Sequence, residues 1–198
     1  MLELILVRHG ETAGNFRPTA LGTTDLLLTE RGKRQASTLS RLLSLEKPTA
    51  IYTSPLKRAV ETAEIIAKPH HMMAETMLDL EERHFGIWEN LPVEEIRAKY
   101  EPEYMAWQAD LPGYVIPQGE SAREAYDRNV RFLEEVVRRH TEGKIVVVSH
   151  LGCIRNMIAY LLGMGIEGAW HFSVDNGKIC RLRIDENAYA VLTAFNEF

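Results

Sequence analysis

The chain has 198 residues, of which 45% are hydrophobic and 26% are charged, and its formal net charge at pH 7 is −5. This balance is typical of a soluble globular protein, and the negative sign argues against a broad basic surface for nucleic acid. The length favours one domain over residues 1–198, and no apolar run reaches the roughly 18 residues that a membrane span needs. The short apolar start lacks the basic segment and cleavage site of a signal peptide, so we expect a cytoplasmic protein.

Short apolar runs alternate with amphipathic stretches in the first part of the chain. A run with β-branched members over residues 2–7 predicts a buried strand. Thr29 is a candidate N-cap for a helix whose apolar positions recur at helical spacing, and Pro48 closes that region. A second strand is predicted over residues 49–53, followed by a helix over residues 56–68.

Ser54 and Pro55 lie between that second strand and its helix. Serine is a preferred N-cap residue, and proline is common at the first helical position because the N–H that it lacks has no helical partner there. The pair therefore predicts that Ser54 caps the helix.

The later part of the chain starts irregularly and ends with clear elements. Several prolines interrupt residues 84–117, where only a short helix over residues 92–100 is predicted. A continuous β-branched run over residues 144–148 is the clearest strand of the chain and is typical of a strand covered on both faces. The other predicted elements are helices over residues 121–140 and 154–162, and strands over residues 178–184 and 188–194.

The alternation of strands and helices predicts an α/β fold with three α/β/α layers, in which helices flank a mostly parallel central sheet. The two cysteines, Cys153 and Cys180, are too few for a disulfide framework and have no C-x-x-C spacing. Free cysteine is among the most buried residue types, so both are expected in apolar surroundings.

Charged side chains follow three of the predicted strands. Arg8 and His9 follow the first, Arg58 begins the helix after the second, and His150 follows the strand over residues 144–148. Because ligands bind at the carboxyl ends of strands in such sheets, we expect these side chains to form one cationic pocket. Arginine guanidinium groups match phosphate oxygens in geometry and charge, so the pocket predicts phosphoryl chemistry.

His9 is the candidate nucleophile of this pocket. A neutral imidazole can form a covalent intermediate, and arginines can neutralise a transferring phosphoryl group without a metal. The leaving alkoxide needs a proton, and the candidate acids are Glu81 and Glu82. The histidines show no metal-site spacing such as H-E-x-x-H, so neither a metal nor another cofactor is expected.

Five segments resemble the motifs of the histidine phosphatase (phosphoglycerate mutase-like) superfamily. A single R-H-G would be weak support, whereas five segments in family order at suitable separations are specific, and they run through nearly the whole chain. They are Arg8-His9-Gly10-Glu11-Thr12 with Asn15, Gly22-Thr23-Thr24-Asp25 with residues 28–36, residues 54–63, Gly119-Glu120-Ser121, and Ser149-His150.

The resemblance implies a role for each matching residue. Glu82, which matches the family's acid position, would protonate the leaving group and later activate water. The phosphorylated nucleophile would be His9, and the residues that hold the phosphoryl oxygens would be Arg8, Arg58 and His150.

The resemblance also implies a substrate site beside the catalytic residues. Residues 84–117 are expected to be an insertion that shapes the substrate pocket within the single domain. The substrate-binding positions are expected to be Asn15, Gly22, Arg83 and Leu151.

Phosphatase and mutase activities are both compatible with these motifs. The run Glu82-Arg83-His84-Phe85-Gly86 is closer to the sequence of this segment in the mutases than in many small phosphatases. However, cofactor-dependent mutases of the family carry a longer insertion before the second histidine, and residues 101–118 contain no lysine or arginine for a second acidic group. A phosphatase is therefore favoured. A non-catalytic regulator that binds phosphorylated ligands is the alternative of another class, and the presence of all five catalytic residues argues against it.

Among small phosphatases, the chain looks most like α-ribazole phosphatases, which dephosphorylate a nucleoside-like intermediate of cobalamin assembly. The likeness lies in residues 22–25 and 85–89, whereas Asn90 and Leu151 stand where glycine is usual. Broad-specificity, sugar-phosphate and phosphoserine phosphatases therefore remain alternatives. The expected partner is a small phosphorylated substrate, with no nucleic acid or membrane, and a homodimer is compatible with the sequence.

Overall fold

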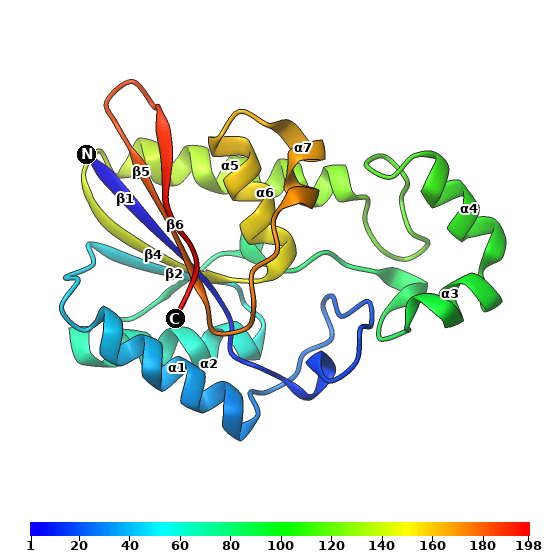
Figure 1. Cartoon of the computed structure of the whole chain (residues 1–198), viewed down its shortest axis with the longest axis horizontal. Coiled ribbons are helices and arrows are strands. Elements are labelled where there is room, and N and C mark those ends of the chain that lie inside the picture. The colour runs from blue at the N-terminus through cyan, green and yellow to red at the C-terminus, as the bar shows by residue number, and fades with distance from the viewer.

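A six-stranded sheet forms the centre of the molecule, and the computed structural model describes all residues, 1–198 (Figure 1). The strands lie side by side in the order β3-β2-β4-β1-β5-β6. Their bounds are β1 Leu2–Arg8, β2 Ala50–Thr53, β3 Glu75–Thr76, β4 Gly143–Ser149, β5 Ile179–Ile184 and β6 Ala190–Glu197.

Most strands of the sheet run in one direction. β1 pairs in parallel with β4, which pairs in parallel with β2, and β3 continues this arrangement at the edge. β5 pairs antiparallel with both β1 and β6, so it is the one strand that runs the other way. The predicted α/β fold with a mostly parallel sheet is therefore confirmed, and the carboxyl ends of β1, β2 and β4 meet at one edge.

Helices cover both faces of the sheet because the buried strands are apolar on both sides. Along β1, Leu4 and Leu6 pack toward one helix layer, and Ile5 and Val7 pack toward the other. All four are fully buried, and each contributes roughly 1.5–3 kcal/mol relative to an exposed position. The first layer contains α5 and α6, and the second contains α1 and α2, on opposite sides of the sheet (Figure 1).

The helices follow the predicted order, with two additions, α4 and the four-residue α7. α4 is a helix with little amphipathic pattern that follows α3 after one residue. The bounds are α1 Glu30–Leu43, α2 Lys57–Ala67, α3 Val93–Lys99, α4 Glu101–Ala109, α5 Ala122–Arg139, α6 Leu151–Leu161 and α7 Gly165–Gly168, with 3₁₀ turns η1 Ala13–Asn15, η2 Lys68–His70, η3 Leu78–Leu80, η4 Gly86–Trp88 and η5 Ala169–His171.

The helix starts show one confirmed cap and one error. Thr29 caps α1 as predicted, since its hydroxyl accepts the backbone N–H of Gly32 at 3.0 Å. The predicted Ser54 cap is wrong, because α2 begins at Lys57 and the carboxylate of Asp25 accepts that residue's N–H at 2.7 Å. The side chain of Ser54 is used elsewhere, beside a histidine of the site.

Residues 84–117 form an arm at the end of the molecule opposite β5 and β6, where α3 and α4 lie (Figure 1). The arm has a small apolar cluster of its own around Trp88. The ring of Trp88 packs edge-on against Trp107 at 5.9 Å and is stacked on Tyr114 at 6.2 Å. These contacts add to the free energy that simple burial of the rings supplies.

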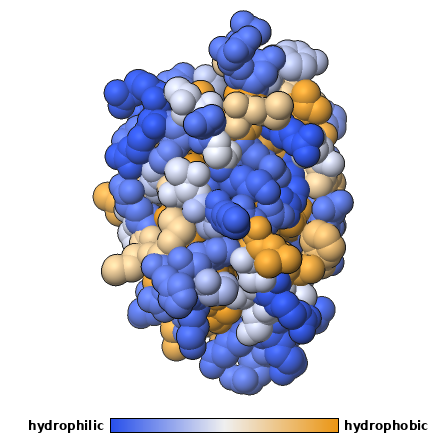
Figure 2. Space-filling view, turned by 90° about the vertical axis from the view of Figure 1, so that its left-hand side faces the viewer, coloured by the Kyte–Doolittle hydropathy of each residue, from blue (hydrophilic) through white to orange (hydrophobic).

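The surface at which β1 begins is the side farthest from this arm. Figure 2 shows that side as mostly hydrophilic, with hydrophobic residues in small separate groups. None of the helices combines the length and apolar character needed to cross a membrane. Cys153 and Cys180 are both free and buried, as predicted.

Candidate active site

A cavity of about 520 Å³ lies at the carboxyl ends of the parallel strands. Its wall includes Arg8, His9, Arg58 and Glu82, which come from three separate stretches of the chain. Two of these residues lie at or directly after the end of β1, and Arg58 is the second residue of α2. The topology therefore gathers the residues that the sequence placed at strand ends.

His9 is held rigidly at the end of β1. Its backbone N–H donates to the carbonyl of Ser149 at 3.0 Å, and its ring Nδ1 lies 2.7 Å from the carbonyl of Gly10. A carbonyl only accepts, so Nδ1 carries the proton in this contact and a neutral ring keeps its lone pair on Nε2. Burial, reinforced by the charges of Arg58 and Arg8, holds the pKa of His9 well below its usual value. The ring is therefore neutral near pH 7, with a free lone pair on Nε2.

Gly10 allows this strand end to approach helix α1 closely. A Cβ built on Gly10 would lie 2.5 Å from the backbone oxygen of Gly32, closer than real Cβ contacts come. The N–H of Gly10 donates to the hydroxyl of Thr62 on α2 at 3.1 Å. The glycine therefore fixes the backbone next to His9 against two helices.

Arg58 is almost completely buried, at 1% exposure, and each of its three guanidinium nitrogens has one protein partner. Nη1 donates to the carbonyl of Thr24 at 2.8 Å, and Nη2 donates to the carbonyl of Gly22 at 2.6 Å. Nε donates to Nδ1 of His150 at 3.2 Å. These contacts orient a fixed positive charge toward the cavity that Arg58 lines.

His150 lies behind the cavity wall and is fully buried. Its Nδ1 accepts from Arg58, so a neutral ring carries its proton on Nε2, which lies 2.7 Å from the hydroxyl of Ser54. Burial and the charge of Arg58 lower its pKa well below the usual value. The ring centroids of His9 and His150 are 5.1 Å apart, so the structure brings the two predicted histidines together.

Arg8 has one partner and one free donor. Its Nη1 donates to the carbonyl of Val174 at 2.6 Å, whereas its Nε is buried without a partner. Buried donors of this kind normally have a partner, so Nε of Arg8 is an unsatisfied donor in a residue of the cavity wall.

Glu82 faces Arg8 and Arg58 from a loop that follows η3. One carboxylate oxygen accepts the N–H of Arg83 at 2.9 Å, and the other accepts the N–H of Gly152 at 3.0 Å. A Cβ on Gly152 would clash with the carboxylate of Glu82. The absence of a side chain at Gly152 therefore lets the start of α6 hold the carboxylate.

The predicted substrate-binding residues fall into two groups. Asn15, Arg83 and Leu151 line the cavity, and Arg83 carries a second buried donor without a partner, Nη2. Burial lowers the pKa of Arg83 to about 10. Gly22 does not line the cavity, because its carbonyl lies behind Arg58 and accepts from that guanidinium.

Residues 84–117 contribute less to the cavity wall than the sequence suggested, since Phe85 is their one lining residue. The wall instead includes two residues that the motifs did not single out, Arg155 on α6 and Trp170 on η5. The guanidinium carbon of Arg155 lies 4.0 Å from the centroid of the Trp170 ring. No local sequence signal pairs them, because only the fold brings η5 against α6.

Glu89 is a further residue that the sequence did not single out as part of the site. Its carboxylate accepts the N–H groups of Thr23 at 2.9 Å and Phe85 at 3.0 Å, and the hydroxyl of Thr24 at 3.0 Å. It thereby fixes the loop whose carbonyls hold Arg58. No group of three or more His, Cys, Asp and Glu side chains is arranged to hold a metal ion.

Comparison with known proteins agrees with this geometry. Residues 4–197 match the family model of the histidine phosphatase superfamily (branch 1). Phosphoserine phosphatase 1 of Hydrogenobacter thermophilus is 36% identical over 97% of this chain and 91% of its own length. The adenosylcobalamin/α-ribazole phosphatase of Escherichia coli is 33% identical over 98% of this chain and 96% of its own length.

A solved structure shows the same fold. The crystal structure of the α-ribazole phosphatase from Shigella flexneri superimposes with a TM-score of 0.91, at 32% identity over 98% of this chain and 96% of that one. The resemblance seen in the sequence motifs thus extends to the family, the fold and relatives that are named phosphatases. The chain belongs to the histidine phosphatase superfamily and is a phosphatase.

Proposed function

We propose that the protein hydrolyses a small phosphomonoester without a metal ion, through a phosphohistidine formed on His9. The observation that carries the proposal is a buried, neutral imidazole whose Nδ1 is tied to Gly10 and which lines the same cavity as Arg8 and Arg58. Such a ring is a ready nucleophile, and the arginines supply the positive charge that a metal ion provides in other phosphoryl-transfer enzymes.

In the first step, the lone pair on Nε2 of His9 attacks phosphorus as the bond between phosphorus and the leaving oxygen breaks. Glu82 in its protonated form donates its proton to that oxygen, so the product leaves as a neutral alcohol. In the second step, the Glu82 carboxylate removes a proton from water, which attacks the phosphohistidine. The P–N bond then breaks, inorganic phosphate forms, and the lone pair returns to Nε2.

Arg8 and Arg58 are proposed to hold the phosphoryl oxygens during both steps. His150 would join them by exchanging its Nε2 contact with Ser54 for a phosphoryl oxygen. The place of Arg8 in the cavity wall supports this role, since its guanidinium puts a positive charge there. Arg58 adds a charge whose position is already fixed by Gly22 and Thr24. Preorganised donors of this kind stabilise transition-state charge without reorganising during the reaction.

The cavity supports a substrate larger than the phosphate group itself. Its volume of about 520 Å³ lies within the range of small-molecule sites, which runs from roughly 300 to 1,000 Å³. We propose α-ribazole 5'-phosphate as the first candidate, since relatives with that activity match nearly the whole chain. Asn15, Arg83 and Leu151 would contact it, and Gly22 would act through Arg58. We also propose that residues 1–198 form one catalytic domain, in which residues 84–117 reach the substrate through Phe85.

Phosphoserine is the second candidate, and one observation favours it. Arg155 lines the cavity, stacks on Trp170, and forms no salt bridge with Glu82, the carboxylate whose charge acts on it. A carboxylate on the substrate would match that charge, and a relative of similar coverage is named a phosphoserine phosphatase. Phosphoglycerate mutase activity would share the phosphohistidine, but α4 supplies no basic residue for a second acidic group.

The experiment is phosphate release in EDTA from a panel of phosphomonoesters. The panel contains α-ribazole phosphate, phosphoserine, sugar phosphates and 3-phosphoglycerate, with His9→Ala as the control. Release in EDTA that disappears in the variant supports the proposal, and the order of kcat/KM ranks the substrates. If release requires an added metal ion or survives in His9→Ala, the proposal is wrong.

A further inference from the structure

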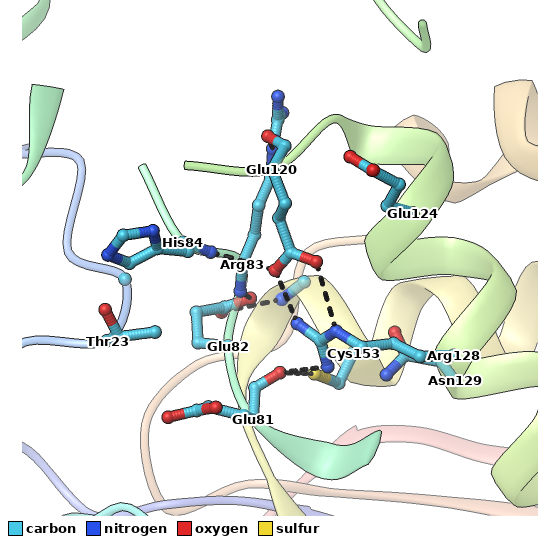
Figure 3. Close-up of polar contacts among 12 residues, drawn as sticks. Thr23, Glu81, Glu82, Arg83, His84, Glu120, Glu124, Arg128, Asn129 and Cys153 are labelled. Carbon is cyan, nitrogen blue, oxygen red and sulfur yellow. Dashed lines mark hydrogen bonds and ion pairs between the residues drawn. The ribbon is translucent and has the colours of Figure 1, made fainter. Parts of the chain in front are cut away.

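Arg128 and Glu120 form an ion pair that lies beside the loop carrying Glu82, as Figure 3 shows. Arg128 is on α5, and Glu120 lies two residues before that helix begins. Nη2 and Nε of the guanidinium contact the two carboxylate oxygens at 2.9 and 3.3 Å. The side chains are only 12% and 21% exposed, so this pair is far less screened by water than a surface pair.

The guanidinium of Arg128 also holds the backbone that leads to Glu82. Its Nη1 donates to the carbonyl of Glu81 at 2.5 Å and to the carbonyl of Asp79 at 3.0 Å. The next residue of α5, Asn129, donates to the same Asp79 carbonyl at 2.7 Å. The chain before Glu82 is thus fixed to α5 through two carbonyls, and the thiol of Cys153 on α6 also donates to the Glu81 carbonyl, at 3.0 Å.

Glu120 holds the backbone that follows Glu82. Its carboxylate oxygen Oε1 accepts the N–H of His84 at 2.9 Å, and its backbone N–H donates to the carbonyl of His84 at 3.0 Å. Its backbone carbonyl accepts Nε of Arg83 at 3.2 Å. The ion pair therefore joins the residue before Glu82 to the residues after it.

Neither member of the pair contacts the carboxylate of Glu82. That carboxylate is held only by the N–H groups of Arg83 and Gly152. One of these donors belongs to the segment that the ion pair fixes, so a shift of that backbone would move the carboxylate relative to His9. A misplacement of about 1 Å in a catalytic group can cost roughly 100-fold in rate.

We propose that Arg128 and Glu120 are positioning residues, and that their ion pair holds the backbone on both sides of Glu82 so that its carboxyl group can reach the leaving oxygen. The inference rests on the proposed acid role of Glu82. It adds two residues whose side chains lie outside the cavity wall and take no part in the bond changes.

The test compares Arg128→Gln and Glu120→Gln with wild type on two esters, an alkyl phosphate and p-nitrophenyl phosphate. An alkoxide needs a proton to leave, whereas p-nitrophenolate leaves without one. We expect kcat/KM for the alkyl ester to fall about 100-fold, and that for p-nitrophenyl phosphate to fall by less than about 3-fold.

The matched control is Arg131→Gln, one turn further along α5. Arg131 also reaches this segment, through the carboxylate of Asp79 at 3.3 Å, but its side chain is 64% exposed and holds no backbone atom there. It should leave both values of kcat/KM unchanged.

A double-mutant cycle with Glu82→Gln separates positioning from general weakening of the fold. If Arg128 acts through Glu82, Arg128→Gln adds no further loss on the alkyl ester once Glu82 is replaced. Equal losses on both esters, or fully additive losses in the double variant, overturn the inference. If Arg128→Gln does not fold, Glu120→Gln, which keeps the side-chain size, decides by the same two criteria. Failure of wild type on both esters would instead contradict the proposed function itself.

Discussion

The inner wall of the cavity comes from strand ends and a helix start, whereas its outer wall comes from loops and a helix face. In the inner wall, His9 and Arg58 are 3% and 1% exposed, and each has several partners within the chain. In the outer wall, Phe16 and Trp170 are 66% and 46% exposed. The inner wall is therefore fixed by the packing of the sheet, and the outer wall can change without disturbing it.

This difference separates the chemistry from the choice of substrate. A change in the inner wall alters groups that the core holds in place, so it should affect every substrate. A change in the outer wall alters contacts with the organic part of the substrate, so its effect should depend on which ester is used. Variants of the two walls can therefore test that division.

Replacing the nucleophile should have the largest effect. His9→Ala is expected to lower kcat by about 10⁴-fold or more on every phosphomonoester, because no other side chain supplies the attacking lone pair. Steady-state phosphate release in EDTA measures this, with circular dichroism to verify the fold. Loss of activity on some esters with full activity on others would contradict the assignment of the chemistry to the inner wall.

Arg58→Met should lower kcat/KM by about 10³-fold on all esters, since an arginine on the transferring group is worth that much in related chemistry. It should also destabilise the fold by about 2–4 kcal/mol, because the carbonyls of Gly22 and Thr24 lose their buried donor. The neighbouring Lys57→Met is the control, since Lys57 is 62% exposed in its ion pair with Asp25. Urea unfolding and kinetics on both variants check the prediction, and equal effects would contradict it.

Gly152→Ala should displace the Glu82 carboxylate, because the new Cβ would occupy the place of that group. The carboxylate is the end of a flexible side chain, so the fold should survive. We expect kcat/KM to fall about 100-fold for alkyl phosphates and only a few-fold for p-nitrophenyl phosphate. Stopped assays on both esters measure the ratio, and an unchanged ratio would argue against Glu82 as the acid.

A change in the outer wall should be smaller and selective. Arg155→Gln is expected to raise KM for phosphoserine by about 10-fold, because a charge-assisted hydrogen bond to the carboxylate would be lost. The kcat and KM values for p-nitrophenyl phosphate should stay within about 2-fold of those of the wild type. An equal loss of kcat/KM on both esters would mean that Arg155 acts in phosphoryl transfer itself rather than in binding the organic part of the substrate.

The buried histidines should make stability depend on pH. The pKa values of His9 and His150 are lowered in the folded protein, so below the unfolded value of about 6.5 only the unfolded chain takes up these protons. The stabilisation is present above about pH 6.5 and is lost as pH falls, by about 1.4 kcal/mol per pH unit for each histidine. Urea unfolding at pH 7 and 5.5 should show this loss, and His9→Ala should halve it. His71→Asn, at an exposed position, should not change it.

Much of the inner wall could be predicted from the sequence because strand ends carry a local signal. The apolar runs of β1 and β4 are followed directly by Arg8 with His9 and by His150, and the sheet topology then places them at one edge. β3 could not be predicted in this way, because its two residues, Glu75 and Thr76, are exposed and have no apolar pattern.

Contacts between distant segments explain what the sequence could not show. Ser54 has the local signal of an N-cap, but a tertiary contact with His150 takes its hydroxyl. Arg128 resembles the charged outer residues of an amphipathic helix, but the loop before Glu82 folds over it. The Arg155–Trp170 contact likewise depends on how η5 returns to α6. Local patterns carry no information on such pairings.

The most direct test of the account is to trap the phosphorylated enzyme. The protein is mixed with substrate in EDTA, quenched in base after milliseconds, and digested for mass spectrometry. A phosphohistidine intermediate should place phosphate on the peptide that contains His9. This phosphate should be stable in base and lost in acid, form at least as fast as turnover, and be absent from His9→Ala. Turnover at the wild-type rate with no phosphorylated peptide, or with the phosphate on another residue, would contradict it.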